Sequence, residues 1–159
     1  MVDNARFLEL FSRRLRVRME RAKCTSGYVS NYCKFGRRAM SDYVNGARLP
    51  NPWYLVLIAE CLDCRVDELL GFRGPAAIMS TDASSTFVDE KEFAVFVRDR
   101  MVERMEAKNM TAEDLANRIG MDLQNVNGWF SMWPALPRTF NLIDVAKALG
   151  CTPSDLLGY

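Results

Sequence analysis

An internal repeat relates the two halves of the chain and constrains the fold more than any other feature. Residues 57–72 pair with residues 144–159, and both stretches close on Leu-Leu-Gly followed by an aromatic residue. Matched residues lie 86 positions apart early in the copies and 87 apart later, so one extra residue in the second copy explains the shift. The matched pairs include Arg14 and Arg100, Met19 and Met105, Thr25 and Thr111, Ala59 and Ala146, Leu62 and Leu149, and Cys64 and Cys151. This pattern predicts a duplicated structural unit.

Each copy has the pattern of about five short helices, so the predicted fold is all-α. An apolar stripe at helical spacing opens both copies, with Phe7, Phe11, Leu15 and Met19 in the first and Phe93, Val97, Met101 and Met105 in the second. Good N-cap residues follow at Thr25 or Ser26 and at Thr111, and Asp67 or Ser154 is the N-cap expected for the last helix. We therefore expect domains at residues 1–73 and 89–159. Residues 74–88, which contain Gly74-Pro75 and a polar run, are the expected linker.

Charge divides unequally between the two halves, although the whole chain carries a formal net charge of only +1. Residues 1–73 hold 13 Lys and Arg against 8 Asp and Glu, which gives +5. Residues 74–159 hold 8 against 12, which gives −4. A basic first copy suits a polyanionic partner, whereas an acidic second copy does not.

Several classes of protein are disfavoured by what the sequence lacks. It has no histidine, and no GxGxxG, P-loop or HExxH motif, so we expect no enzyme and no cofactor. Cys61 and Cys64 form a CxxC, which is either part of a zinc site or, as favoured here, a pair of buried structural thiols without metal. No apolar run approaches the ~18 residues of a membrane span, and the N-terminus lacks a secretory pattern, so a cytoplasmic protein is expected.

Both copies carry parts of a recurring helix-turn-helix pattern. The second copy has Thr111, Leu115-Ala116, Gly120, Met121, Val126 and Trp129, and the first has Met40, Ser41, Tyr43, Asn45-Gly46 and Pro50. On these residues the chain resembles the Cro/repressor (XRE-like) helix-turn-helix family. The resemblance implies two tandem five-helix, lambda-repressor-like domains. The first copy departs from the pattern at Val29-Ser30 and at Lys34, which replaces a turn glycine at a cost of roughly 1 kcal/mol.

The resemblance also assigns candidate contacts with double-stranded DNA in the first copy. The base-reading positions are Arg37, Arg38, Ser41 and Asp42, and the phosphate-contacting positions are Ser26, Asn45 and Arg48. Arginine is the usual partner of guanine, and Asp42 could accept from cytosine or orient an arginine. The alternative is that Arg37 and Arg38 are solvated surface charges.

The second copy has a different surface at the equivalent helix. Gln124 and Asn127 could read adenine and form a second reader, but no cation lies on this helix. Phe130, Met132 and Trp133 follow it in a short loop and indicate a protein interface, the alternatives being packing within the chain or DNA contact.

Two functions fit these patterns. The first is a sequence-specific, repressor-like transcriptional regulator, with DNA read by the first domain and dimerisation or partner binding by the second. A homodimer is expected by analogy with dimers that read two half-sites. The second is a protein-binding module of the antiactivator or antitoxin-like kind, which kept the fold without reading DNA.

Overall fold

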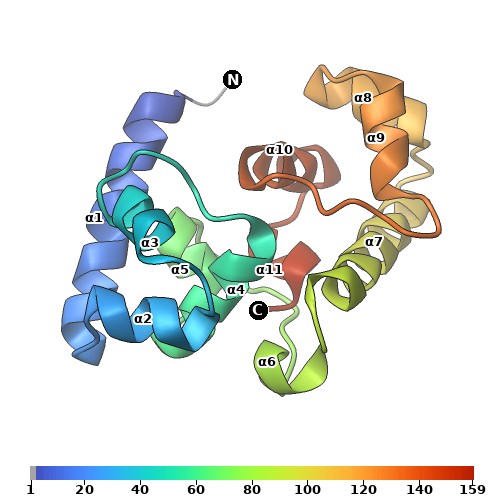
Figure 1. Cartoon of the computed structure of the whole chain (residues 1–159). Coiled ribbons are helices and arrows are strands. Elements are labelled where there is room, and N and C mark those ends of the chain that lie inside the picture. The colour runs from blue at the N-terminus through green and yellow to red at the C-terminus, as the bar shows by residue number, and fades with distance from the viewer. Residues whose placement is uncertain (1–2) are drawn as a thin grey trace. The chain divides into compact units, whose positions relative to one another are not determined.

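A computed structural model describes residues 3–159, so residues 1 and 2 of the expected first domain lie outside it. The described part contains eleven α-helices and no strand, which confirms the all-α prediction (Figure 1). The chain divides between Arg73 and Gly74 into two compact units. No helix in residues 3–159 is both long and apolar enough to cross a membrane.

The first unit contains five helices. They are α1 (Asn4–Ala22), α2 (Ser26–Cys33), α3 (Arg37–Val44), α4 (Pro52–Cys61) and α5 (Val66–Leu70). The expected stripe of α1 is buried at Phe11, Leu15 and Met19, and α4 is buried on most sides. Asp3 caps α1 by accepting from the Arg6 N–H, and Thr25 caps α2 by accepting from the Tyr28 N–H. The core of this unit therefore holds α2 and α3 in fixed positions against α1 and α4.

The second unit repeats this order of helices after one additional short helix. Its helices are α6 (Ala83–Thr86), α7 (Glu90–Ala107), α8 (Ala112–Ile119), α9 (Leu123–Trp129), α10 (Thr139–Leu149) and α11 (Pro153–Leu157). The stripe of α7 is buried at Phe93, Val97, Met101 and Met105. Thr111 caps α8, as the sequence predicted, and forms a reciprocal capping box with Asp114.

The N-cap prediction for the last helix of each unit is wrong by two residues. Helix α5 begins after Arg65 and α11 after Thr152, and Asp67 and Ser154 lie buried inside these helices. The reason is that the side chain of the third residue of each helix accepts a hydrogen bond from the backbone N–H of the residue before the helix. Glu68 accepts from the Arg65 N–H at 2.7 Å, and Asp155 accepts from the Thr152 N–H at 3.0 Å.

Residues 74–88 were expected to be a linker, but the structure packs them on the second unit. The Ala77 N–H donates to Asp155 Oδ1 at 2.8 Å, and the Met79 N–H donates to the Gly158 carbonyl at 2.6 Å. Ala83 is fully buried, and the Phe87 ring meets the rings of Phe93, Phe96 and Tyr159. A few buried apolar side chains and backbone hydrogen bonds therefore hold residues 74–88 against the second unit, although the stretch contains a polar run.

Replacing Lys34 by glycine is expected to stabilise the first unit by about 1 kcal/mol. Lys34 ends α2 with a φ of 60°, and Gly120 ends α8 with a φ of 71°. An L side chain is strained in this region, so Lys34→Gly should raise the midpoint of urea unfolding followed by circular dichroism. Gly120→Ala is the matched control: an added Cβ would meet nothing within 4 Å, so only backbone strain should lower stability. A destabilised Lys34→Gly variant would contradict this account.

Candidate nucleic-acid interface

Helices α2 and α3, joined through Lys34 to Gly36, form the first candidate interface. One side of α3 is fixed in the core by Met40 and Tyr43, which are 1% and 2% exposed. The Phe35 ring lies edge-on to Tyr43 and Tyr54, with centroid distances of 5.4 and 5.2 Å. Because these residues pack in the core, they fix the orientation of α3, and its opposite side faces solvent.

Arg37 and Arg38 occupy the first two positions of α3, and both are exposed. Neither has a hydrogen bond or ion pair among residues 3–159. Gly36 caps the helix without a side-chain bond, so the first-turn N–H groups have no side-chain acceptor. The N-terminus of a helix carries partial positive charge, and two cations there cost some stability. The same arrangement concentrates positive potential where an anion could bind.

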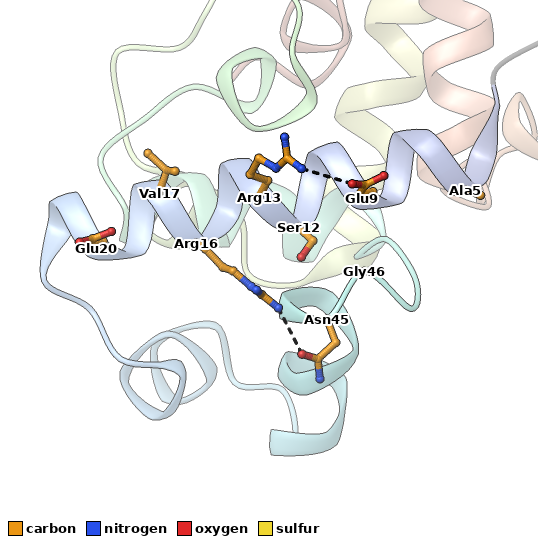
Figure 2. Close-up of a pocket in the computed structure, with 9 residues that line it drawn as sticks. All are labelled: Ala5, Glu9, Ser12, Arg13, Arg16, Val17, Glu20, Asn45 and Gly46. Atoms are coloured by element: carbon orange, nitrogen blue, oxygen red, sulfur yellow. Dashed lines mark hydrogen bonds and ion pairs between the residues drawn. The ribbon is translucent and has the colours of Figure 1, made fainter.

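Ser41 and Asn45 continue the exposed side of α3, and α1 fixes its end. Asn45 Nδ2 donates to Ser41 Oγ at 3.2 Å, while Arg16 donates to Asn45 Oδ1 at 3.4 Å and to the Val44 carbonyl at 3.0 Å. Figure 2 shows Arg16 reaching from α1 to Asn45. Both residues line a pocket of about 500 Å³. Ser12 also donates to the Val44 carbonyl, at 2.5 Å. Arg16 was not among the residues predicted from the sequence, because only the fold shows that it reaches α3.

Asp42 and Arg48 form an ion pair at the C-terminal end of α3. Arg48 Nε lies 3.0 Å from Asp42 Oδ2, and its guanidinium lies over the Tyr43 ring, 5.2 Å from the centroid. Of the two roles considered for Asp42, this geometry suits the orientation of an arginine. The pair is about half exposed at Arg48, so the guanidinium keeps open donors.

The N-terminus of α2 supplies the remaining candidate. Ser26 is its first residue and is exposed. Tyr28, which the sequence analysis did not select, is 56% exposed in the same turn. Tyrosine hydroxyls often bond to phosphate, so an aromatic residue just after an N-cap was an available clue.

The equivalent surface of the second unit has the opposite charge. Gln124 and Asn127 are exposed on α9, but the helix is capped by Asp122 and its exposed first residue is Leu123. The first turn of α8 contains Glu113 and Asp114. Hydrogen bonds from the Thr111 backbone and hydroxyl keep the pKa of Asp114 below its ordinary value, so the carboxylate stays charged.

The loop after α9 displays apolar side chains on an anchored backbone. Met132 and Trp133 are 79% and 82% exposed, whereas Phe130 is half-buried and Trp129 is buried. Arg98 donates to the carbonyls of Ser131 and Met132 at 2.9 and 3.2 Å. Two of the three residues expected at an interface are thus exposed, and the loop that carries them is held in one position.

The five cysteines of the chain are free thiols. Within residues 3–159, no group of three or more Cys, Asp or Glu side chains is placed to hold a metal ion. Cys61 and Cys64 are free thiols, and burial raises their pKa to about 11 and about 12. Both therefore remain protonated and weakly nucleophilic near neutral pH.

Residues 100–159 match the family of Cro/C1-type helix-turn-helix DNA-binding domains. The matched stretch runs from within α7 to the end of the chain and contains α8 and α9. No curated protein and no solved structure matches the chain. The family match supports a DNA-binding regulator in general, and it favours a regulator over an enzyme.

Proposed function

We propose that this protein is a sequence-specific, repressor-like transcriptional regulator in which the first unit reads DNA. The observation that carries the proposal is the exposed first turn of α3, where Arg37 and Arg38 have no partner among the described residues. Unpaired cations at a helix N-terminus lower the stability of the unit, so they do not serve folding. Binding of a polyanion such as DNA gives them a role.

The proposed roles of the side chains follow their places on α3 and α2. Arg37 and Arg38 contact guanine edges, and Ser41 contacts a base one turn further along. Asp42 positions Arg48 for phosphate, and Ser26 and Asn45 donate to phosphate oxygens. Arg16 is a positioning residue, because it holds Asn45 and the end of α3.

The second unit, which carries the family match, has the less suitable surface for phosphate. We propose that it dimerises the protein or binds a partner through Met132 and Trp133, with Phe130 at the edge. Two apolar side chains about four-fifths exposed on an anchored loop support this role. A homodimer would place two α3 helices on two half-sites. Gln124 and Asn127 form a weaker second reader in the same scheme.

A protein-binding module that does not read DNA is the second candidate. The exposed Met132 and Trp133 favour it directly, since an antiactivator or antitoxin-like partner would need such a surface. In that case Arg37 and Arg38 would be solvated charges.

Fluorescence anisotropy of the full chain with a labelled generic duplex, over a salt series, tests the two candidates. For a reader with two to four phosphate contacts we expect log Kd to change with log salt with a slope of about 2 to 4. In vitro selection should then enrich one short motif. Absence of duplex binding at low salt would reject the regulator and leave the protein-binding module.

A further inference from the structure

A second groove of the first unit lies between α1 and α5, on residues that the proposed DNA contacts do not use. It has a volume of about 420 Å³, and we call it the α1/α5 groove. Its charged lining consists of Arg13, Arg14, Arg18, Arg21, Arg73 and Glu68. Five guanidinium groups around one carboxylate make it strongly cationic.

In the second unit, a segment of the same unit lies along the edge of the equivalent groove. Arg100 and Arg104 of α7 correspond to Arg14 and Arg18, and Asp155 of α11 corresponds to Glu68. An extended segment of the same unit, residues 77–79, lies against them. Arg100 Nη2 donates to the Ala77 carbonyl at 2.6 Å. The Ala77 N–H donates to Asp155 Oδ1, and the Met79 N–H donates to the Gly158 carbonyl.

Arg100, Asp155 and Gly158 hold this segment in the second unit. In the part of the chain that the structure describes, the corresponding residues of the first unit do not make the equivalent hydrogen bonds to a peptide segment. Within residues 3–159, Arg14 makes one hydrogen bond, a long one to the Leu70 carbonyl at 3.4 Å, and its guanidinium lies against Gly71. Burial without a counter-charge lowers the pKa of Arg14 from its ordinary value. Gly71 corresponds to Gly158, and no donor reaches its carbonyl from residues 3–159. Glu68 keeps the same pair of roles as Asp155, because it caps α5 and contacts Arg18 at 3.2 Å.

Charge distinguishes the two grooves. The groove in the second unit, which has a volume of about 330 Å³, balances Arg100 and Arg104 with Glu103 and Asp155, and the segment along its edge, residues 77–79, is uncharged. The α1/α5 groove has an excess of cations, so its occupant should carry negative charge.

We propose that the α1/α5 groove binds an extended acidic peptide segment of a partner protein. A backbone carbonyl of the peptide accepts from Arg14, its N–H groups donate to Glu68 and to the Gly71 carbonyl, and its acidic side chains lie near Arg13 and Arg21. The backbone hydrogen bonds proposed here follow those that residues 77–79 make in the second unit. The arginines around the groove would favour peptides with acidic residues on either side of the bound segment.

The probe is a fluorescent synthetic peptide with residues 75–80 of this chain flanked by two glutamates at each end, and its control has glutamines instead. Anisotropy with the full chain should show tighter binding of the glutamate peptide. Arg14→Ala should weaken both peptides by at least about tenfold, the loss expected for a charge-assisted hydrogen bond. Arg13→Ala with Arg21→Ala should weaken only the glutamate peptide, and these exposed residues can be removed without harm to the core.

Arg6→Ala is the matched control, because Arg6 is an exposed cation of α1 outside the groove. The proposal is overturned if the glutamate peptide fails to bind at low salt, or if Arg6→Ala weakens it as much as Arg14→Ala does. It is also overturned if Arg14→Ala impairs duplex binding while no peptide binds, since the groove would then be a DNA-backbone surface. These outcomes do not depend on Arg37 and Arg38.

Discussion

Replacing Arg37 and Arg38 together by alanine is expected to reduce the affinity for the selected duplex by roughly a hundredfold or more, since each base contact contributes about 1–3 kcal/mol. The slope of log Kd against log salt should fall by about 2 if both side chains contact phosphate, and by less if they contact only bases. Anisotropy titrations of the full chain at several salt concentrations measure both quantities.

The same double substitution should not harm folding, which separates lost contacts from lost structure. Two cations leave the first turn of α3, where they oppose the helix dipole, so the melting temperature should stay constant or rise. Arg118→Ala with Arg138→Ala removes equal charge from exposed positions of the second unit and serves as control. Equal loss of affinity in both double variants would mean that net charge, and not α3, drives binding.

The sequence predicted the helices of both units well where local chemistry sets the boundary. Thr25 and Thr111 bond to backbone N–H groups of their own first turns, so their N-cap roles depend on only a few residues. The strain at Lys34 was also visible, because the aligned glycine indicates a positive φ that the structure confirms. The stripes of α1 and α7 followed from helical periodicity alone.

Other features depend on contacts between distant residues, and the sequence did not show them. The backbone of residues 77–79 is fixed by Arg100, Asp155 and Gly158, which lie far along the chain. Arg16 is important for α3 only because α1 passes beside Asn45. Asp67 resembles an N-cap residue by type, but the reach of Glu68 back to the Arg65 N–H places the helix start earlier.

Charge and family resemblance point to different units of this chain. The family match covers residues 100–159, whose equivalent of α3 begins with an aspartate N-cap and has no cation. The first unit lies outside the matched residues, yet α3 begins with two exposed arginines. Lys34 stands where the second unit has Gly120, but the first unit still has the helices that present these arginines. The proposal that the first unit binds DNA therefore depends on the charge of its surface. Variants that unfold one unit at a time can test it.

Phe11→Ala and Phe93→Ala should each cost about 3–5 kcal/mol of stability, because each removes a fully buried ring and leaves a cavity. Such a loss is a large part of the total stability of a small unit. Phe11 lies in the unit proposed to read DNA, and Phe93 lies in the other. On heating, Phe11→Ala should lose duplex binding at a temperature at which Phe93→Ala still binds. Circular dichroism and anisotropy melts of the same samples measure unfolding and release together.

The dimer contribution can be separated in the same experiment. If the second unit dimerises the protein, Phe93→Ala should weaken binding to a duplex with two half-sites while its affinity for a single half-site is kept. Phe11→Ala should weaken both, because the reader itself unfolds. The reverse pattern, with single-site binding lost in Phe93→Ala and kept in Phe11→Ala, would assign DNA reading to the second unit. It would then make Gln124 and Asn127 the base-reading residues in place of Arg37 and Arg38.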